Sequence, residues 1–224
     1  MTAINQTIDQ LCEMKLTGLK EALTKQLEDI SYDNLSFEER IGHLVQAELI
    51  TRKNRKTLRL QKNAKMKYKN AMLTDVNFAP RRNLNRTAVM GLRNLEWINR
   101  NRNIIITGAT GTGKTWLACA FTNFAVINGY SACFMRINQL LLEITASRID
   151  GTYLSYLKKI GKFNILILDD LGISPLSSQD ELELLEIIED RVLKGSLIIT
   201  AQVPVKDWYG FFKIRTSLTL FSIE

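Results

Sequence analysis

Short apolar runs alternate with longer amphipathic stretches through the second half of the chain. Four runs have the length of buried strands, at residues 104–107, 131–135, 164–170 and 197–200. Between and after them, apolar residues recur every three or four positions, which predicts helices over about 114–128, 139–149, 153–160 and 178–193. Strands that alternate with helices indicate a parallel sheet covered by helices on both faces. We therefore expect an α/β domain over residues 79–224.

The first third of the chain has the pattern of amphipathic helices alone. Apolar residues recur at intervals of three to five over residues 8–30, with Gly18 as a weak point inside this predicted helix. A second helix is expected to begin at Ser36, whose hydroxyl and the Glu39 carboxylate can form a reciprocal cap. The same kind of cap is expected from Ser178 and Glu181 at the last predicted helix. The amino-terminal pattern predicts a small, all-helical domain over residues 1–78.

Basic residues are concentrated between residues 52 and 69. The chain has a formal net charge of +7 at pH 7 and a pI of about 9.3, and no acidic residue interrupts this run. Because a run of one sign repels itself unless an anion neutralises it, a phosphate backbone is favoured over an ordinary solvated face, with an acidic protein as the alternative partner. We predict one helix that binds duplex DNA without reading bases. Its contact residues are Arg52, Lys53, Arg55, Lys56, Arg59, Lys62, Lys65 and Lys69.

Cysteine and histidine are too few and too scattered for a zinc site or a disulfide framework. Cys12, Cys119 and Cys133 lack paired spacing, and His43 is the sole histidine. The first residues show no basic-then-apolar signal, and no apolar run approaches the roughly 20 residues that a membrane span needs. We therefore expect a cytoplasmic protein with no membrane partner.

A glycine-rich segment joins the first predicted strand to the next helix. Residues 108–115 read Gly-Ala-Thr-Gly-Thr-Gly-Lys-Thr and match the phosphate-binding pattern G-x-x-x-x-G-K-S/T in full, which an ordinary glycine turn does not. Glycines let consecutive N–H groups turn inward, and the helix N-terminus adds positive potential. Lys114 is expected at the β- and γ-phosphates and Thr115 on Mg²⁺. The predicted nucleotide-binding residues are Gly108, Ala109, Thr110, Gly111, Thr112, Gly113, Lys114, Thr115 and Trp116.

Polar residues at the ends of two later strands are expected at the same edge of the sheet. Asp169 would hold Mg²⁺ through water, and Asp170 would orient the attacking water. Aspartates also follow strands as turn residues, but the coupling to a phosphate loop favours the metal site. Thr200 and Gln202 end the next strand and are candidates for contact with the γ-phosphate or its water, or equally for ordinary loop residues.

These segments together resemble the IstB-like family of AAA+ ATPases. The similarity lies in residues 108–115, in residues 165–172, in residues 200–208, and in residues 35–40 with the basic helix after them. It extends from about residue 10 to about residue 213. Proteins of this family are transposition helpers of insertion sequences and are related to the DnaC helicase loaders.

The resemblance implies an AAA+ P-loop fold, a parallel sheet with helices on both faces preceded by a helical domain. It also implies ATP and Mg²⁺ as cofactors, duplex DNA and a cognate transposase as partners, and a homo-oligomer. Asp170 would be the catalytic carboxylate and Gln202 or Thr200 the γ-phosphate sensor. A DnaC-like helicase loader would use the same nucleotide site, but the lysine-rich helix and residues 203–208 favour the transposition helper. A hydrolysis-deficient remnant of such a helper is a further alternative. A small-molecule kinase ranks last.

The sequence after Lys213 departs from the family pattern, which continues with an Asp-Pro stretch ending in an arginine that acts across a subunit interface. Residues 213–224, written in permitted codons and read in another frame, spell Asp-Pro-Asn-Ile-Ala-Asp-Ala-Ile-Leu-Asp-Arg. We therefore predict a frameshift after Lys213. Without that arginine, we expect ATP binding with little hydrolysis, so whether the chain is an ATPase stays open.

Overall fold

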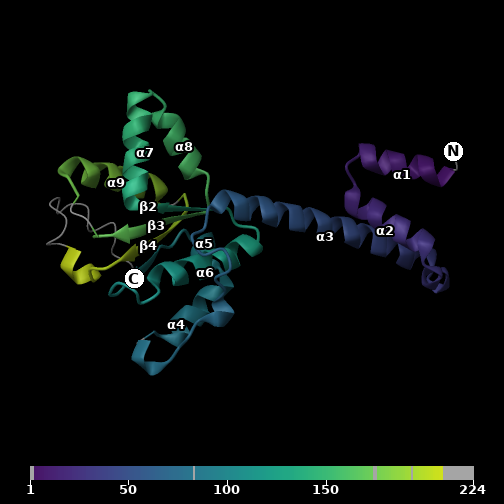
Figure 1. The fold of residues 1–224 in the computed structure, drawn as a ribbon, viewed down its shortest axis with the longest axis horizontal. Coiled ribbons are helices and arrows are strands. Elements are labelled where there is room, and N and C mark those ends of the chain that lie inside the picture. Colours follow the sequence, from purple (N-terminus) through teal and green to yellow (C-terminus); the bar gives the residue numbers. More distant parts are fainter. Residues whose placement is uncertain (1–2, 83, 174–175, 193, 209–224) are drawn as a thin grey trace. The chain divides into compact units, whose positions relative to one another are not determined.

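The computed structural model describes residues 3–82, 84–173, 176–192 and 194–208 (Figure 1). The chain divides into two compact units between Arg59 and Leu60. This packing boundary lies ahead of the one expected at residue 78, because Leu60, Ala64 and Met66 belong to the hydrophobic core of the second unit. The frameshift predicted after Lys213 falls outside the described residues.

The first unit contains helices only, and the single helix expected over residues 8–30 is two. These are α1 (Ala3–Glu13) and α2 (Thr17–Glu28), and the chain turns between them at Lys15, whose φ is 59°. A short 3₁₀ turn (Ile30–Asn34) then leads to α3 (Phe37–Ala64). The reciprocal cap predicted at its start is confirmed, because the Glu39 carboxylate accepts from the Ser36 N–H (2.8 Å) and the Ser36 hydroxyl accepts from the Glu39 N–H (3.3 Å).

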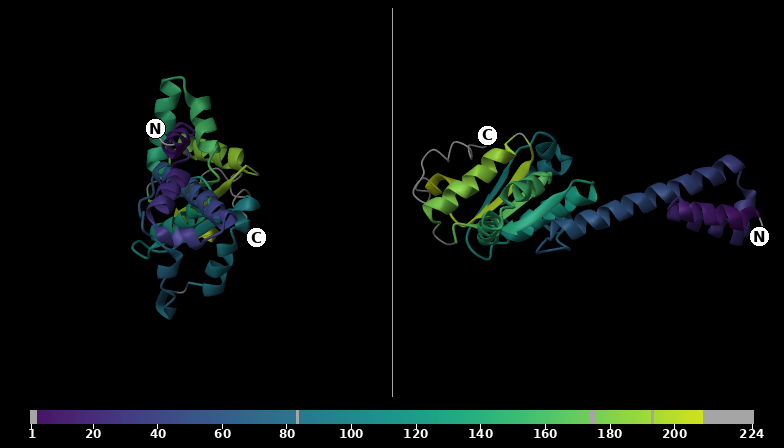
Figure 2. Two further views of the ribbon diagram at one scale, coloured as in Figure 1. Left: turned by 90° about the vertical axis from the view of Figure 1, so that its right-hand side faces the viewer. Right: turned by 90° about the horizontal axis from the view of Figure 1, so that it is seen from above.

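Helix α2 lies antiparallel to the first part of α3 (Figure 2). The Glu48 carboxylate accepts hydrogen bonds from the N–H groups of Gly18 (2.9 Å) and Leu19 (3.1 Å), so a side chain of α3 caps the start of α2. A Cβ on Gly18 would overlap Thr51 and lie 2.6 Å from the Ala47 carbonyl oxygen. Gly18 is therefore the contact point of the two helices rather than a weak point in one helix.

The second unit is built on a four-stranded parallel sheet with the order β1-β4-β3-β2. All four strands were predicted, and each end lies within one residue of the prediction. Short helical segments lead up to the sheet: Leu73–Asp75, Pro80–Arg82, α4 (Arg86–Gly91), Leu92–Asn94 and α5 (Glu96–Asn99). The strands are β1 (Ile104–Thr107), β2 (Ala132–Arg136), β3 (Ile165–Leu171) and β4 (Ser196–Ala201).

Both faces of the sheet are buried, as the apolar runs predict. On β3, Ile165 and Ile167 pack into the core that contains α6, whereas Leu166 and Leu168 pack into the core on the other face. Figure 1 shows α7, α8 and α9 together on that second face and α6 opposite them. The predicted α/β fold class is confirmed. The covering helices are α6 (Lys114–Ile127), α7 (Ile137–Ile149), α8 (Tyr153–Gly161) and α9 (Ser178–Arg191).

The cap of α9 differs from the prediction by one residue. The Ser177 hydroxyl accepts from the Asp180 N–H (3.1 Å), and the Asp180 carboxylate accepts from the Ser177 N–H (2.9 Å). The predicted pair of Ser178 and Glu181 is therefore wrong. Ser177 has the extended backbone of an N-cap, with φ −72° and ψ 160°, whereas Ser178 is already the first helical residue. Among the described residues, no helix is long and apolar enough to cross a membrane.

Candidate nucleotide site and cationic segment

The glycine-rich segment connects β1 to α6 at the carboxyl edge of the sheet. Gly111 and Gly113 have φ values of 79° and 94°, in the left-handed region that a side chain would strain. Gly113 is the N-cap of α6 and offers no side chain to cap the first helical N–H groups. Unsatisfied N–H groups at the start of a helix, together with its dipole, form an anion-binding site. The backbone here therefore has the geometry that phosphates require.

Lys114 folds over this loop. Its Nζ donates a hydrogen bond to the Ala109 carbonyl oxygen (2.9 Å), which also accepts from the Thr112 hydroxyl (2.9 Å). The positive charge of the lysine therefore lies against the backbone turn that is predicted to enclose the phosphates.

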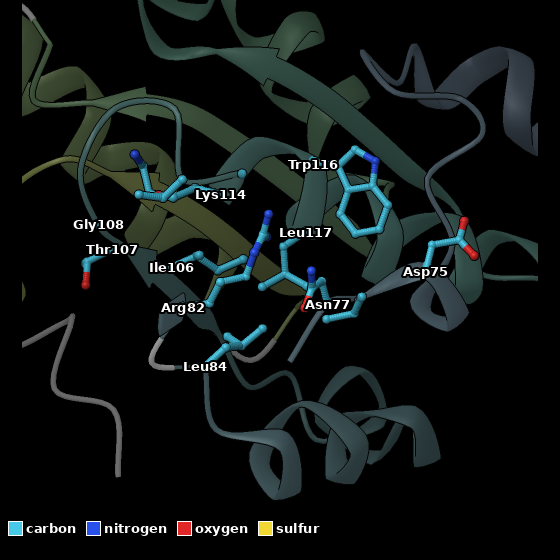
Figure 3. A pocket seen from close by; sticks show the side chains of 13 residues that line it. Asp75, Asn77, Arg82, Leu84, Ile106, Thr107, Gly108, Lys114, Trp116 and Leu117 are labelled. Atoms are coloured by element: carbon cyan, nitrogen blue, oxygen red, sulfur yellow. The ribbon is translucent and has the colours of Figure 1, made fainter. Parts of the chain in front are cut away.

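A pocket of about 410 Å³ opens beside the loop, a volume within the range of small-ligand sites (Figure 3). Five of the predicted nucleotide-binding residues line it: Gly108, Thr112, Gly113, Lys114 and Trp116. The opposite wall comes from the segment that precedes the sheet and includes Asp75, Asn77, Arg82 and Leu84. Sequence reasoning missed this wall, because the segment carries no motif and its approach to the loop depends on tertiary packing.

Asp169 lies at the end of β3 and is fully buried, with 0% of its surface exposed. Its Oδ1 accepts hydrogen bonds from the hydroxyls of Thr115 (2.7 Å) and Thr200 (2.6 Å), whereas its Oδ2 has no hydrogen-bond partner among the described residues. A buried carboxylate oxygen without a partner is costly unless a cation compensates it. Hydroxyl and carboxylate oxygens are ligands that Mg²⁺ prefers, so Thr115 and Asp169 fit the ion predicted for them.

Asp170 interrupts the regular backbone of β3. Its φ is 69°, and the pairing of β3 with β4 shifts register between Leu168 and Leu171. Such bulges commonly redirect a side chain at functional sites. The Nε atom of Arg136, at the end of β2, lies 3.6 Å from Oδ2 of Asp170. Sequence reasoning did not select Arg136, although its place at the carboxyl end of a predicted strand was a usable signal.

The two candidates for γ-phosphate contact differ in their surroundings. Thr200 is fully buried, and its hydroxyl donates to Asp169 and accepts from the Asp170 N–H (3.0 Å). Gln202 is half-buried, and its N–H donates to the Leu171 carbonyl oxygen (3.4 Å). Thr200 therefore holds the two aspartates in place, and direct contact of either residue with phosphate stays a prediction.

The cationic run does not form one helix to residue 69. Helix α3 ends at Ala64, and Lys65 has a left-handed φ of 51°, so Lys65 and Lys69 lie beyond the helix. The reason is burial, because Ala64, Met66 and Ala71 are packed into the core and the chain must turn to bring them there. The prediction of a continuous helix is wrong at this end.

All eight predicted DNA-contacting residues are exposed. Arg52 pairs with Glu48 (2.7 Å), and this hydrogen bond lowers the pKa of Glu48. In the described parts of the chain, the other seven form no ion pair. Their charges are therefore available to an external anion.

Asn123 of α6 anchors the turn that follows the run. Its Nδ2 group lies within hydrogen-bond distance of the carbonyl oxygens of Tyr68 (3.0 Å), Lys69 (3.1 Å) and Ala71 (3.0 Å). The helix that begins at the phosphate loop therefore also fixes the backbone around Lys69.

Solved structures share the fold of about two thirds of this chain. A crystal structure of the DnaC helicase loader matches with a TM-score of 0.58 and 22% identity, over 68% of this chain and 92% of that chain. AMPPCP-bound DnaA from Aquifex aeolicus matches with a TM-score of 0.59 and 18% identity, over 68% of this chain and 48% of that chain. These likenesses confirm the AAA+ fold expected from the sequence.

Sequence comparisons give the family. A family model described as IstB-like ATP binding protein matches residues 9–219. The insertion sequence IS1162 putative ATP-binding protein of Pseudomonas fluorescens is 38% identical over 198 residues, which are 88% of this chain and 86% of the relative. A putative insertion sequence ATP-binding protein of Sinorhizobium fredii, y4pL, is 36% identical over 203 residues, or 91% and 82% of the two chains. The chain therefore belongs to the family of IstB-like ATP binding proteins.

Proposed function

We propose that this protein binds ATP with Mg²⁺ beside the glycine-rich loop, binds duplex DNA through the cationic run, and assists the transposase of an insertion sequence. The observation that carries the nucleotide part is the buried Asp169. Its Oδ2 has no hydrogen-bond partner among the described residues, while Thr115 of the phosphate loop donates to its other oxygen. A buried strand-end carboxylate bonded to the loop threonine is the arrangement that a nucleotide with its metal ion requires.

Each residue of the site then has a defined task. The first N–H groups of α6 and the Lys114 ammonium bind the phosphates, and Thr115 and Asp169 would hold Mg²⁺, which neutralises phosphate charge. Asp170, which has a left-handed backbone within β3, orients a water molecule toward the terminal phosphate. We assign to Gln202, at the same edge of the sheet, the contact that reports this phosphate.

The DNA part rests on charge. The seven predicted contact residues other than Arg52 are exposed and form no ion pair with a described residue, so a phosphate backbone can neutralise them without breaking an ion pair in the fold. Lysine-rich contacts of this kind position DNA and carry little sequence information. The affinity should therefore depend on salt more than on sequence.

The helper role is favoured over helicase loading by the relatives. The relatives reported above, at 38% and 36% identity, are named as insertion-sequence ATP-binding proteins. The resemblance to the DnaC loader, at 22% identity, concerns the fold alone. We place the protein in the cytoplasm, as a homo-oligomer on DNA with its transposase.

ATP turnover with and without duplex DNA tests the proposal, beside Lys114→Ala and Asp170→Asn. We expect Lys114→Ala to lose ATP binding and to retain DNA binding, because the cationic run is unchanged in this variant. Asp170→Asn should keep both ligands and lose any turnover that the wild type shows. An unaltered ATP affinity in Lys114→Ala would contradict the nucleotide assignment, and DNA binding that is insensitive to salt would contradict the DNA assignment.

A further inference from the structure

We propose that Arg82 binds the phosphate chain of the nucleotide from the segment that precedes the sheet, as a second cation opposite Lys114. The inference rests on the proposed nucleotide function and adds a residue that lies outside the phosphate-loop motif. It assigns to the short turn Pro80–Arg82 a direct part in recognising nucleoside di- and triphosphates.

The position of the guanidinium carries the argument. Nη1 of Arg82 lies 3.9 Å from the place that a Cβ on Gly113 would occupy, and both residues line the 410 Å³ pocket. In Figure 3 the Arg82 side chain extends into this pocket between Lys114 and Trp116. Gly113 is the N-cap of α6, so the guanidinium lies beside the uncapped N–H groups that are expected to meet phosphate.

The charges around Arg82 favour an anionic ligand. Arg82 forms no ion pair with a described residue, although Asp75 lines the same pocket. The side chain of Asp75 instead accepts a hydrogen bond from the Thr74 hydroxyl (3.1 Å). Two cations, Arg82 and Lys114, therefore line one pocket, and their mutual repulsion is relieved when an anion lies between them.

The chemistry of arginine suits this ligand. A planar guanidinium can donate two parallel hydrogen bonds to phosphate oxygens, whereas lysine offers a point charge. The nearby Arg86 differs, because its guanidinium lies over the ring of Phe78 (5.4 Å) and is engaged within the fold. The backbone N–H of Arg82 donates to the Ala79 carbonyl oxygen (2.9 Å), which fixes the turn that presents the side chain.

Displacement of a fluorescent ATP analogue by tripolyphosphate and by adenosine tests the inference. The proteins are the wild type, Arg82→Gln, Arg82→Lys, Arg102→Gln and Lys114→Ala. Arg102 is an exposed arginine just before β1, at the opposite end of that strand from the loop, and is the matched control. The analogue carries the same phosphates, so its own affinity is first measured in each protein and used to convert the displacing concentrations into inhibition constants. We expect Arg82→Gln to raise the inhibition constant of tripolyphosphate about tenfold and to leave that of adenosine unchanged. Arg82→Lys should be intermediate, and Arg102→Gln should match the wild type.

The possible results separate the two claims. Unchanged inhibition constants for both ligands in Arg82→Gln would overturn the inference, while loss of analogue binding in Lys114→Ala would still support the proposed function. Equal weakening of both ligands would also overturn it, because Arg82 would then shape the pocket rather than bind phosphate. If the wild type binds no analogue, the proposed function itself is wrong.

Discussion

The hydroxyl of Thr200 donates a hydrogen bond to Oδ1 of Asp169 (2.6 Å), from the end of β4 to the end of β3. The same hydroxyl accepts from the backbone N–H of Asp170 (3.0 Å), and Thr115 donates to the same carboxylate oxygen from α6. One buried threonine therefore fixes the positions of both aspartates relative to the phosphate loop. This makes Thr200 a positioning residue of the site.

We predict that Thr200→Val lowers the affinity for ATP in the presence of Mg²⁺. It should also lower the free energy of unfolding by about 1–3 kcal/mol, because a buried donor to a charged carboxylate is lost while the side-chain volume is kept. Thr200→Ser keeps the hydroxyl and should retain the affinity. Calorimetric titration of ATP into the three proteins measures these affinities. Equal affinities for Thr200→Val and the wild type would show that ATP binding does not depend on the hydrogen bond from Thr200 to Asp169.

Charge reversal of Lys62, Lys65 and Lys69 to Glu should weaken binding to unrelated duplexes alike. Each phosphate contact contributes about 0.9 to the slope of log affinity against log salt on B-DNA, so the slope should become shallower. The control reverses Lys158, Lys159 and Lys162, three exposed lysines of α8 and its end, with the same change in net charge. Fluorescence anisotropy over a salt series measures both slopes. An equal loss in the control would assign the effect to net charge, and loss at one sequence only would indicate base reading.

Asn123→Ala should release the turn that contains Lys69. Three carbonyl oxygens lose their donor, which is expected to cost about 1–3 kcal/mol of stability and to speed hydrogen exchange in residues 66–73. Asn128→Ala is the matched control, because Asn128 lies on exposed surface just after α6 and its side chain bonds only the Phe124 carbonyl oxygen among the described residues (2.8 Å). Exchange measured by mass spectrometry should change in the first variant alone. Similar exchange in both would mean that the turn is held by its buried side chains.

Two glycines of the helical unit should respond in opposite directions to substitution by alanine. Gly18→Ala places a methyl group against Thr51 and Ala47, and overpacking of this kind costs about 1–3 kcal/mol. Gly42→Ala has nothing within 4 Å of the new methyl group and lies inside α3, where alanine is better than glycine by about 0.5–1 kcal/mol. Hydrogen exchange of the α2 amides should be faster in the first variant and no faster than wild type in the second. The reverse order would contradict the packing of α2 on α3.

The sheet and the phosphate loop could be predicted because their signals are local. Runs such as residues 165–168 are apolar at every position, since both faces of the sheet are covered, and the loop motif follows from backbone and phosphate chemistry. The place of Asp169 beside the phosphate loop followed from the rule that parallel strands end at one edge, whereas its hydrogen bond with Thr115 is known from the structure alone.

What could not be predicted depends on contacts between distant residues. Helix α3 stops at Ala64 because residues after it are buried in the core that contains α6. Position 18 has to be glycine because a side chain there would overlap Thr51 and Ala47 of α3. Ser177 and Ser178 both have an acidic residue three positions later, so spacing alone could not choose between them. Arg82 and Arg136 reach the site from segments without a motif.

The most direct test of the nucleotide site is calorimetric titration of ATP into the wild type, Lys114→Ala and Asp169→Asn, each with Mg²⁺ and with EDTA. We predict that the wild type binds ATP more tightly with Mg²⁺ than with EDTA. Lys114→Ala should bind far more weakly in both, because the phosphates lose a point charge, and Asp169→Asn should lose the difference between Mg²⁺ and EDTA. If all three proteins bound ATP with the same affinity in Mg²⁺ and in EDTA, the assignment of this nucleotide and Mg²⁺ site would be contradicted.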